Sequence, residues 1–207
     1  MIDPSHDVTS EAQLDEIYGA VHEVSLLKEI DHVSDHYRTF IDASPFVLIA
    51  TAGPEGLDCS PRGDPAGFVR VADPKTLLIP DRRGNNRVDS LRNIVRDPRI
   101  GLLFLIPGVG ETLRVNGRAR ISTDPELRAG FEMQGKLPAS VIVVAVERVY
   151  FQCPKALVRS RLWSSDVQIP RSALPSSGTI LQALTENRVE AQTYDAAYPQ
   201  RIKETIY

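Results

Sequence analysis

Near residue 45 the spacing of apolar positions along this chain changes from helical to strand-like. Upstream, Ser10 and Gln13 match a capping box that opens a helix from Glu11 to Tyr18. Apolar residues at helical spacing predict a second helix from about Asp31 to Ala43, which Ser44-Pro45 ends. Residues 1–44 are therefore expected to form an N-terminal helical extension.

Downstream, short apolar runs separated by turns rich in Gly and Pro predict β-strands. The expected strands are Phe46–Thr51, Leu57–Arg62, Gly67–Val71, Thr76–Ile79, Ile100–Ile106, Thr112–Ser122 and Val141–Phe151. Helices are expected at about Arg87–Arg96 and after Asp124-Pro125. Six or seven closely spaced strands with few helices between them favour an antiparallel barrel or sandwich, a mostly β fold of the α+β class. We expect the barrel to occupy residues 45–165, and residues 166–207 to form a connector and C-terminal helices that pack on the barrel or on a partner.

Bulk composition narrows the class of protein. A hydrophobic content of 42% and a charged content of 25% suit a globular chain with a real core. A formal net charge of −3 gives no general attraction to nucleic acid or anionic membrane, and no apolar run is long enough to span a bilayer. The first seven residues lack the features of a signal peptide, and the only cysteines are Cys59 and Cys153, without metal-type spacing. These features predict a cytoplasmic protein.

The positive charge is carried mainly by arginine. The chain has nineteen arginines and five lysines, and ten arginines but no lysine lie between Lys75 and Lys136. Arginine suits planar, bidentate recognition of phosphate or carboxylate, whereas lysine acts mostly as a solubilising point charge. A GC-rich genome would also favour arginine, so the clustering of the arginines is more informative than their number.

The segment Pro80-Asp81-Arg82-Arg83-Gly84-Asn85-Asn86-Arg87 leaves a predicted strand and enters a predicted helix. Free backbone N–H groups at a helix start favour an anion. The glycine permits close backbone approach, and the two asparagines tolerate unusual backbone angles while offering amide donors. The three arginines are candidates to clamp a phosphate through charge-assisted hydrogen bonds. The alternatives are a solvated basic turn, or arginines paired with Asp81 and Asp89.

Two further segments carry candidate binding residues. Ser60-Pro61-Arg62-Gly63-Asp64 ends a predicted strand, and its proline and glycine interrupt regular pairing and leave backbone groups for a ligand. There Asp64 is a candidate acceptor for a ring N–H, and Arg62 a candidate to stabilise an anionic ring or phosphate; the alternative is a structural Arg–Asp turn. The only tryptophan, Trp163, follows Arg161 and suits stacking on a planar ring, or equally a core or dimer contact.

Other chemistries find less support. His32 and His36 are four residues apart on the expected helix, but no third ligand is evident, so no metal site is predicted. The glycine-rich dinucleotide motif, the Walker A loop, the Gly-x-Ser-x-Gly elbow and the His-Glu-x-x-His motif are absent from the sequence. Their absence argues against a Rossmann enzyme, a P-loop NTPase, a serine hydrolase and a zinc protease of the usual types.

Taken together, the chain resembles the pyridoxamine 5′-phosphate oxidase-like superfamily of FMN-binding split β-barrels, and more narrowly a subgroup of FMN-dependent enzymes of unsettled activity. The resemblance extends over about residues 30–165. It is carried by Ser60-Pro61-Arg62-Gly63-Asp64, Leu78-Ile79-Pro80-Asp81, Gly84-Asn85-Asn86-Arg87, Gly101–Gly108, Leu113–Ala119 and Arg159-Ser160-Arg161-Leu162-Trp163.

The resemblance implies a six- or seven-stranded split barrel with flanking helices, and a homodimer with two FMN sites at the subunit interface. Residues Ser60 to Asp64 are expected to lie along the isoalloxazine, with Pro80 and Asp81 on the neighbouring strand. The phosphate is expected to be bound by Arg83, Asn85, Asn86 and Arg87. Thr112 and Trp163 are further expected to reach the flavin from the partner chain.

The chain also departs from the pyridoxamine-phosphate oxidases proper. Gly-Asn-Asn-Arg stands where those enzymes have a Ser-Arg-Lys phosphate loop, and no histidine follows His36, so their Arg-x-His substrate element has no counterpart. Vitamin B6 oxidation is therefore not expected, although FMN binding is. The expected function is a flavin-dependent oxidoreductase that transfers a hydride through flavin N5, with a small-molecule donor such as NADH or NADPH. The alternative is a flavin-binding redox sensor or partner-binding module without turnover; a haem, deazaflavin or nucleic-acid ligand is a lesser alternative.

Overall fold

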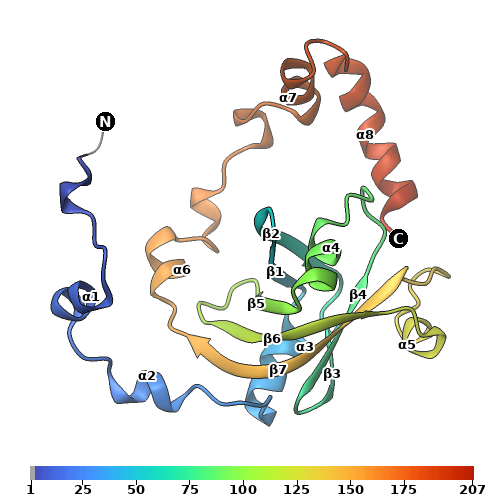
Figure 1. Cartoon of the computed structure of the whole chain (residues 1–207). Helices are drawn as coiled ribbons and strands as arrows, with labels where there is room; N and C mark the ends of the chain where they lie inside the picture. The colour runs from blue at the N-terminus through green and yellow to red at the C-terminus, as the bar shows by residue number, and fades with distance from the viewer. Residues whose placement is uncertain (1–2) are drawn as a thin grey trace.

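The computed structural model describes residues 3–207, so the first two residues of the expected N-terminal extension lie outside the described part. Seven antiparallel strands form one sheet in the order β2-β1-β5-β6-β7-β4-β3 (Figure 1). The strands are β1 (Phe46–Gly53), β2 (Gly56–Gly63), β3 (Arg70–Asp73), β4 (Thr76–Asp81), β5 (Arg99–Leu105), β6 (Thr112–Ser122) and β7 (Ser140–Gln152). Because β2 and β3 end the order, the sheet is not closed. This arrangement confirms the expected mostly β split barrel of the α+β class.

The central pair of strands, β6 and β7, is paired along almost its whole length, with one irregularity. Its register shifts between Asn116 and Gly117, which marks a β-bulge. A Cβ added at Gly117 would lie only 2.1 Å from the carbonyl oxygen of Ala145 on β7. The close approach of the two backbones at this point therefore requires glycine.

The core lies on the inner face of the sheet and is covered by two helices, α3 (Asp35–Ala43) and α4 (Asp89–Arg96). Alternate residues of the strands point into it, as in β1, where Val47 and Ile49 are fully buried. Helix α4 packs across β1, β2 and β6, and α3 packs against β3, β6 and β7. The largest fully buried side chains are Phe104, Ile41, Ile49, Leu77, Ile79, Leu102, Leu113 and Ile142.

The first helix confirms its sequence prediction, but α3 and β3 begin about four and three residues later than predicted. Helix α1 covers Glu11–Tyr18 and has the complete capping box. Helix α3 starts at Asp35 and not near Asp31, because Ser34 accepts a hydrogen bond from the Tyr37 N–H and caps it there. Similarly, β3 starts at Arg70 and not at Gly67, because residues 65–68 form a turn in which Gly67 has a φ of +86°.

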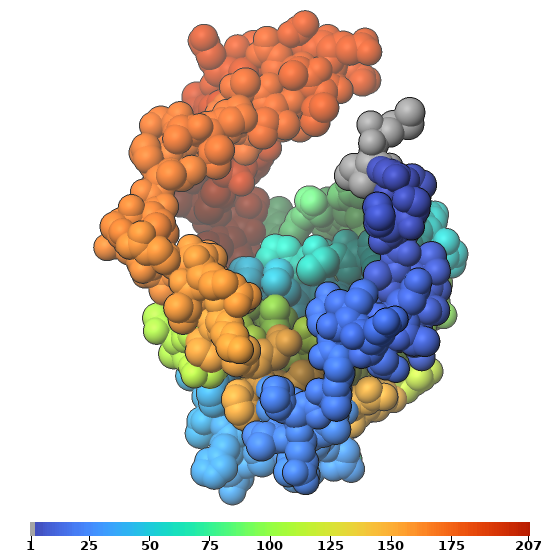
Figure 2. Space-filling model, turned by 90° about the vertical axis from the view of Figure 1, so that its left-hand side faces the viewer, coloured from blue at the N-terminus to red at the C-terminus, as the bar shows by residue number. Residues whose placement is uncertain are grey.

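Two arms extend from the barrel (Figures 1 and 2). The N-terminal arm holds α1 and α2 (Glu23–Leu27), and its described residues through Leu27 are exposed. The C-terminal arm runs through α6 (Lys155–Ser160) and α7 (Ser177–Leu184) to α8 (Ala191–Thr205). It arches away from the barrel and then brings the end of α8 back beside β4 (Figure 1). Residues that follow α8 can therefore reach the barrel at the end of β4.

Three other features of the described residues bear on function. Within residues 3–207, no helix combines the length and the apolar character needed to cross a membrane. Both cysteines, Cys59 and Cys153, are exposed and free. Across the same residues no group of three or more His, Cys, Asp or Glu side chains is arranged to hold a metal ion.

Candidate functional site

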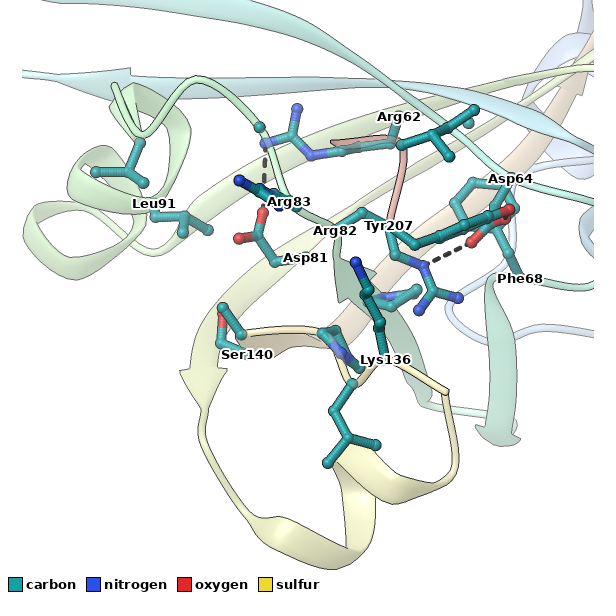
Figure 3. A pocket seen from close by; sticks show the side chains of 18 of the residues that line it. Arg62, Asp64, Phe68, Asp81, Arg82, Arg83, Leu91, Lys136, Ser140 and Tyr207 are labelled. Carbon is teal, nitrogen blue, oxygen red and sulfur yellow. Dashed lines mark hydrogen bonds and ion pairs between the residues drawn. The ribbon is translucent and has the colours of Figure 1, made fainter. Parts of the chain in front are cut away.

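A cavity of about 760 Å³ lies where the ends of β2 and β4 meet the segment before β7 (Figure 3). Its volume is in the range of roughly 300–1,000 Å³ typical of small-molecule sites. One wall is formed by Pro61–Asp64 of β2 and its end, a second by Pro80–Asn86, and a third by Lys136–Ser140. Phe68, Val88, Leu91, Ile206 and Tyr207 complete the lining. The cavity thus combines charged groups with apolar and aromatic walls.

Sheet pairing explains why these segments meet. In β4, Asp81 lies directly opposite Ser140 of β7, and Pro80 lies opposite Val141. Because this pairing places the start of β7 beside the end of β4, the turn that precedes β7, which contains Lys136 to Ala139, also lies at the cavity. Gln134 and Gly135 both have positive φ in this turn, which lets Met133 and Lys136 pair with each other.

The loop from Arg82 to Val88 joins β4 to α4 and is open to a ligand. Asn86 and Val88 adopt left-handed backbone angles, with φ of 62° and 52°, and no side chain caps the start of α4. The backbone N–H groups of residues 83–86 donate to no acceptor within residues 3–207. A Cβ added at Gly84 would meet no atom within 4 Å, so a ligand can approach the backbone there. Such a loop at a helix start is suited to an anion.

The three arginines of this loop have different surroundings. Arg82 donates from Nε to Asp64 at 2.7 Å and from a terminal nitrogen to the Phe131 carbonyl oxygen at 2.6 Å. Arg87 pairs with Asp89 at 2.8 Å outside the cavity, and 75% of its side chain is exposed. Arg83 lines the cavity and forms no ion pair within residues 3–207. Of the three, Arg83 has a guanidinium at the cavity that no carboxylate already binds.

Arg62 and Asp81 face each other across the cavity (Figure 3). Their charged atoms are 3.9 Å apart, at the outer limit of an ion pair. Burial raises the pKa of the Asp81 carboxyl, and the nearby Arg62 charge only partly offsets that rise. Asp81 is therefore a carboxyl group that is costly to ionise in the folded protein.

The raised pKa of Asp81 predicts a pH dependence of stability. The folded state retains a proton on Asp81 above pH 3.8, where the unfolded chain has lost it. Stability should therefore fall as pH rises from 3.8 through the folded pKa and then level off. In Asp81→Asn, we expect this fall to be absent and the protein to be more stable at pH 7. Urea denaturation at several pH values measures the free energy of unfolding of both proteins. If its pH dependence is the same in the variant as in the wild type, the raised pKa of Asp81 is contradicted.

The far end of the cavity is built around Asp64, whose side chain is 1% exposed. One of its oxygens accepts from Arg82, and the other accepts from the Tyr207 hydroxyl at 2.7 Å. The Arg82 guanidinium also lies over the Tyr207 ring, 5.4 Å from its centroid. The Asp64 carboxylate holds the pKa of the Tyr207 phenol above its usual value, because ionisation would break their hydrogen bond. Tyr207 thus covers Asp64 on the cavity side.

The structure brings together most of the residues proposed from the sequence. Those that line the cavity are Pro61, Arg62, Gly63, Asp64, Pro80, Asp81, Arg83, Asn85 and Asn86. Ser60 does not line it, and its hydroxyl donates to Asp58 at 3.0 Å. Arg87, as described above, pairs outside the cavity. Thr112 and Trp163 do not line the cavity either. Thr112 is the first residue of β6, and Trp163 follows α6, where its indole N–H donates to the carbonyl oxygen of Val109, in the turn before β6, at 2.8 Å.

Sequence reasoning did not select the third wall of the cavity or its aromatic end. The segment Lys136–Ser140 had a usable signal, because a predicted β4–β7 pair would have placed it beside Asp81. For Tyr207 the sequence offered no signal, because 143 positions separate it from Asp64. Phe68 was assigned to a strand, although it belongs to the turn before β3.

The fold and the cavity together define a class of protein: an open antiparallel barrel with a cavity and a basic loop between the ends of β2 and β4. Residues 33–153, more than half of the chain, match the family model described as pyridoxamine 5′-phosphate oxidase. The chain belongs to that family.

Solved structures with similar folds were also found. They include HupZ of Group A Streptococcus (19% identity, 56% of this chain, 91% of that chain, TM-score 0.47). The General Stress Protein 26 of Bacillus anthracis (15% identity) covers 55% of this chain and 88% of its own, with a TM-score of 0.41. An FMN-binding protein of Syntrophomonas wolfei (11% identity) covers 55% and 82%, with a TM-score of 0.43. A comparison with curated proteins finds no match.

Proposed function

We propose that this chain binds FMN in the cavity between β2 and β4 and acts as a flavin-dependent oxidoreductase. The observation that supports this most directly is the loop Arg83–Asn86, whose backbone N–H groups and Arg83 guanidinium, at the cavity, have no hydrogen-bond acceptor or carboxylate partner among residues 3–207. A phosphate there would gain charge-assisted hydrogen bonds from Arg83 and from the loop backbone. The family membership and the size of the cavity both suit this cofactor.

The remaining lining would hold the isoalloxazine ring. Its contacts would come from the small or rigid lining residues Pro61, Gly63 and Pro80, and Leu91 would add an apolar contact. Arg62 is available to a negatively charged edge of the ring, since its pairing with Asp81 is long at 3.9 Å. When bound, FMN supplies hydride chemistry at N5, and the chain supplies binding, orientation and electrostatics.

The substrate is not expected to be a pyridoxine phosphate. No histidine occurs after His36, so an Arg-x-His element for a substrate phosphate has no counterpart in this sequence. We propose instead a small-molecule electron donor such as NADH or NADPH. Reduction of the bound flavin by either nucleotide, followed by turnover with an acceptor, would support the oxidoreductase; a bound flavin that neither nucleotide reduces would favour a non-catalytic flavin module.

We also propose that the protein is a homodimer. Both arms expose large apolar side chains that their own barrel leaves uncovered, among them Ile17, Val24 and Leu27 in the N-terminal arm and Val158 in the C-terminal arm. Thr112 and Trp163 can contribute to a flavin site only through a second copy, because they lie outside their own chain's cavity. Light scattering should give the mass of two chains, and flavin analysis should give two FMN per dimer; a monomer with bound FMN would contradict this proposal.

The test of the proposed function compares two arginines of the same loop. Arg83→Ala should weaken FMN binding by about 10- to 100-fold, because it removes a charge-assisted contact to phosphate. Arg87→Ala should change it by less than about 2-fold, because an exposed pair with Asp89 contributes little. Quenching of FMN fluorescence by added apoprotein measures both affinities.

The purified wild-type protein should show a two-peaked yellow absorption spectrum, and heat denaturation should release FMN into the supernatant. A colourless protein that fails to take up added FMN would refute the proposed function. Equal losses of affinity in the two arginine variants would refute the assignment of the phosphate to Arg83.

A further inference from the structure

The residues after α8 return to the barrel and join the wall of the cavity. Ile206 and Tyr207 both line it, although the preceding helices α7 and α8 pack on each other and lie away from the sheet (Figure 1). Within the described chain, the hydrogen bond from Tyr207 to Asp64 is the only one that joins residues 177–207 to the barrel. The contact therefore holds Ile206 and Tyr207 against the barrel.

This contact has the features of a specific attachment. The acceptor, Asp64, is almost fully buried and has its second oxygen bound by Arg82. A hydrogen bond to an ionised carboxylate is stronger than one between neutral groups. The Arg82 guanidinium over the phenol ring adds a cation–π contact to the same side chain. Figure 3 shows Tyr207, Asp64 and Arg82 gathered at one end of the cavity.

The attachment leaves the cavity open. The volume of about 760 Å³ is bounded by Tyr207 and is not filled by it. With Tyr207 in place, the 1% exposure of Asp64 leaves its carboxylate no surface for a ligand. A ligand at this end therefore meets the phenol ring and Ile206, and the negative charge of Asp64 is covered.

We propose that Ile206 and Tyr207 form a closing wall of the ligand site, that Asp64 and Arg82 hold this wall, and that Tyr207 adapts the site to a planar, anionic ligand. The part concerning the ligand rests on the proposed function, and the part concerning the attachment does not. An uncovered Asp64 would repel an anionic ligand, whereas a tyrosine ring offers a flat contact surface. Tyr207 is a specificity-determining residue of the site, and Asp64 is a positioning residue that acts through it.

The attachment is tested without any ligand by hydrogen exchange of the backbone amides in α8 and the residues after it. Tyr207→Phe keeps the ring but removes the hydroxyl, so exchange should accelerate about 10-fold or more. Asp64→Asn keeps an acceptor without the charge and should give a smaller increase. Tyr198→Phe is the matched control, because Tyr198 lies on α8 but does not line the cavity. Exchange in Tyr207→Phe at the wild-type rate would overturn the attachment.

The wall is tested by FMN affinity in the full-length chain. Tyr207→Ala should weaken binding by about 2- to 10-fold through the loss of the aromatic contact and the uncovering of Asp64. Tyr207→Phe should bind more tightly than Tyr207→Ala, because it retains the ring. Tighter binding by Tyr207→Ala than by the wild type would show that Tyr207 competes with the ligand, and would overturn the proposal. If the wild type binds no FMN while Tyr207→Phe still accelerates exchange, the proposed function and the ligand part of this proposal fail and the attachment stands.

Discussion

Arg82→Met should lower the free energy of unfolding by about 3–5 kcal/mol, the cost typical of breaking a buried ion pair from one side. Asp64 would keep a carboxylate that is 1% exposed, and its remaining donor would be the Tyr207 hydroxyl. The carbonyl oxygen of Phe131 would also lose its Arg82 donor. Methionine retains much of the side-chain length, so the loss should come from charge and hydrogen bonding. Urea denaturation followed by circular dichroism measures it.

Two further variants test whether the broken Asp64–Arg82 pair causes the loss of stability in Arg82→Met. Arg87→Met breaks an exposed pair with Asp89 and should cost about 0–1 kcal/mol. Adding Asp64→Asn to Arg82→Met removes the stranded charge and should recover part of the lost stability. If Arg82→Met and Arg87→Met unfold at the same urea concentration, the Asp64–Arg82 pair does not stabilise the fold.

Gly117→Ala should destabilise the protein by about 3 kcal/mol, at the upper end of what overpacking usually costs. The added Cβ would lie 2.1 Å from the Ala145 carbonyl oxygen and 3.1 Å from its carbon. Both contacts involve backbone, so no side-chain rotation can relieve them. Since β6 and β7 are the central pair of the sheet, the bulge would have to shift.

Gly101→Ala is the matched control for this prediction. Gly101 lies on β5, next to β6, and its added Cβ would meet the nearest atom, Asn116 Oδ1, at 3.5 Å. That is an ordinary van der Waals contact, so thermal unfolding should change by only a few degrees. A Gly117→Ala protein as stable as Gly101→Ala would mean that the bulge relaxes without cost.

The sequence predicted the elements where local chemistry alone determines them. The capping box at Ser10 and the apolar strands such as Ile100–Ile106 depend on neighbours within a few residues, and the structure contains them. The start of α3 was missed by four residues, because the bridge of Ile30 to Val149 and the bond of the Val33 N–H to Pro74 hold the preceding segment in extended form. These partners are distant in sequence, and no local pattern reveals them.

In the candidate site, too, some features are determined by local sequence and others by contacts between distant residues. A short basic loop with glycine and two asparagines could be recognised from the sequence, because the preferences for left-handed backbone and for anions are properties of those residue types. The left-handed Asn86 agrees with that reading. The sequence could not tell which arginine faces the cavity, since Arg82, Arg83 and Arg87 have the same chemistry.

By itself, then, the sequence determined the strand-rich fold class, the family and the loop that carries the candidate phosphate site. Only the tertiary structure decided that Arg82 is bound by Asp64, that Arg83 is left to the cavity, and that Tyr207 lines the cavity and binds Asp64. The physical reason is that hydrophobic spacing and backbone preference act over a few residues. The Asp64–Arg82 ion pair joins side chains 18 positions apart, and the hydrogen bond from Tyr207 to Asp64 spans 143 positions, so both form only when the sheet and the C-terminal arm bring these residues together.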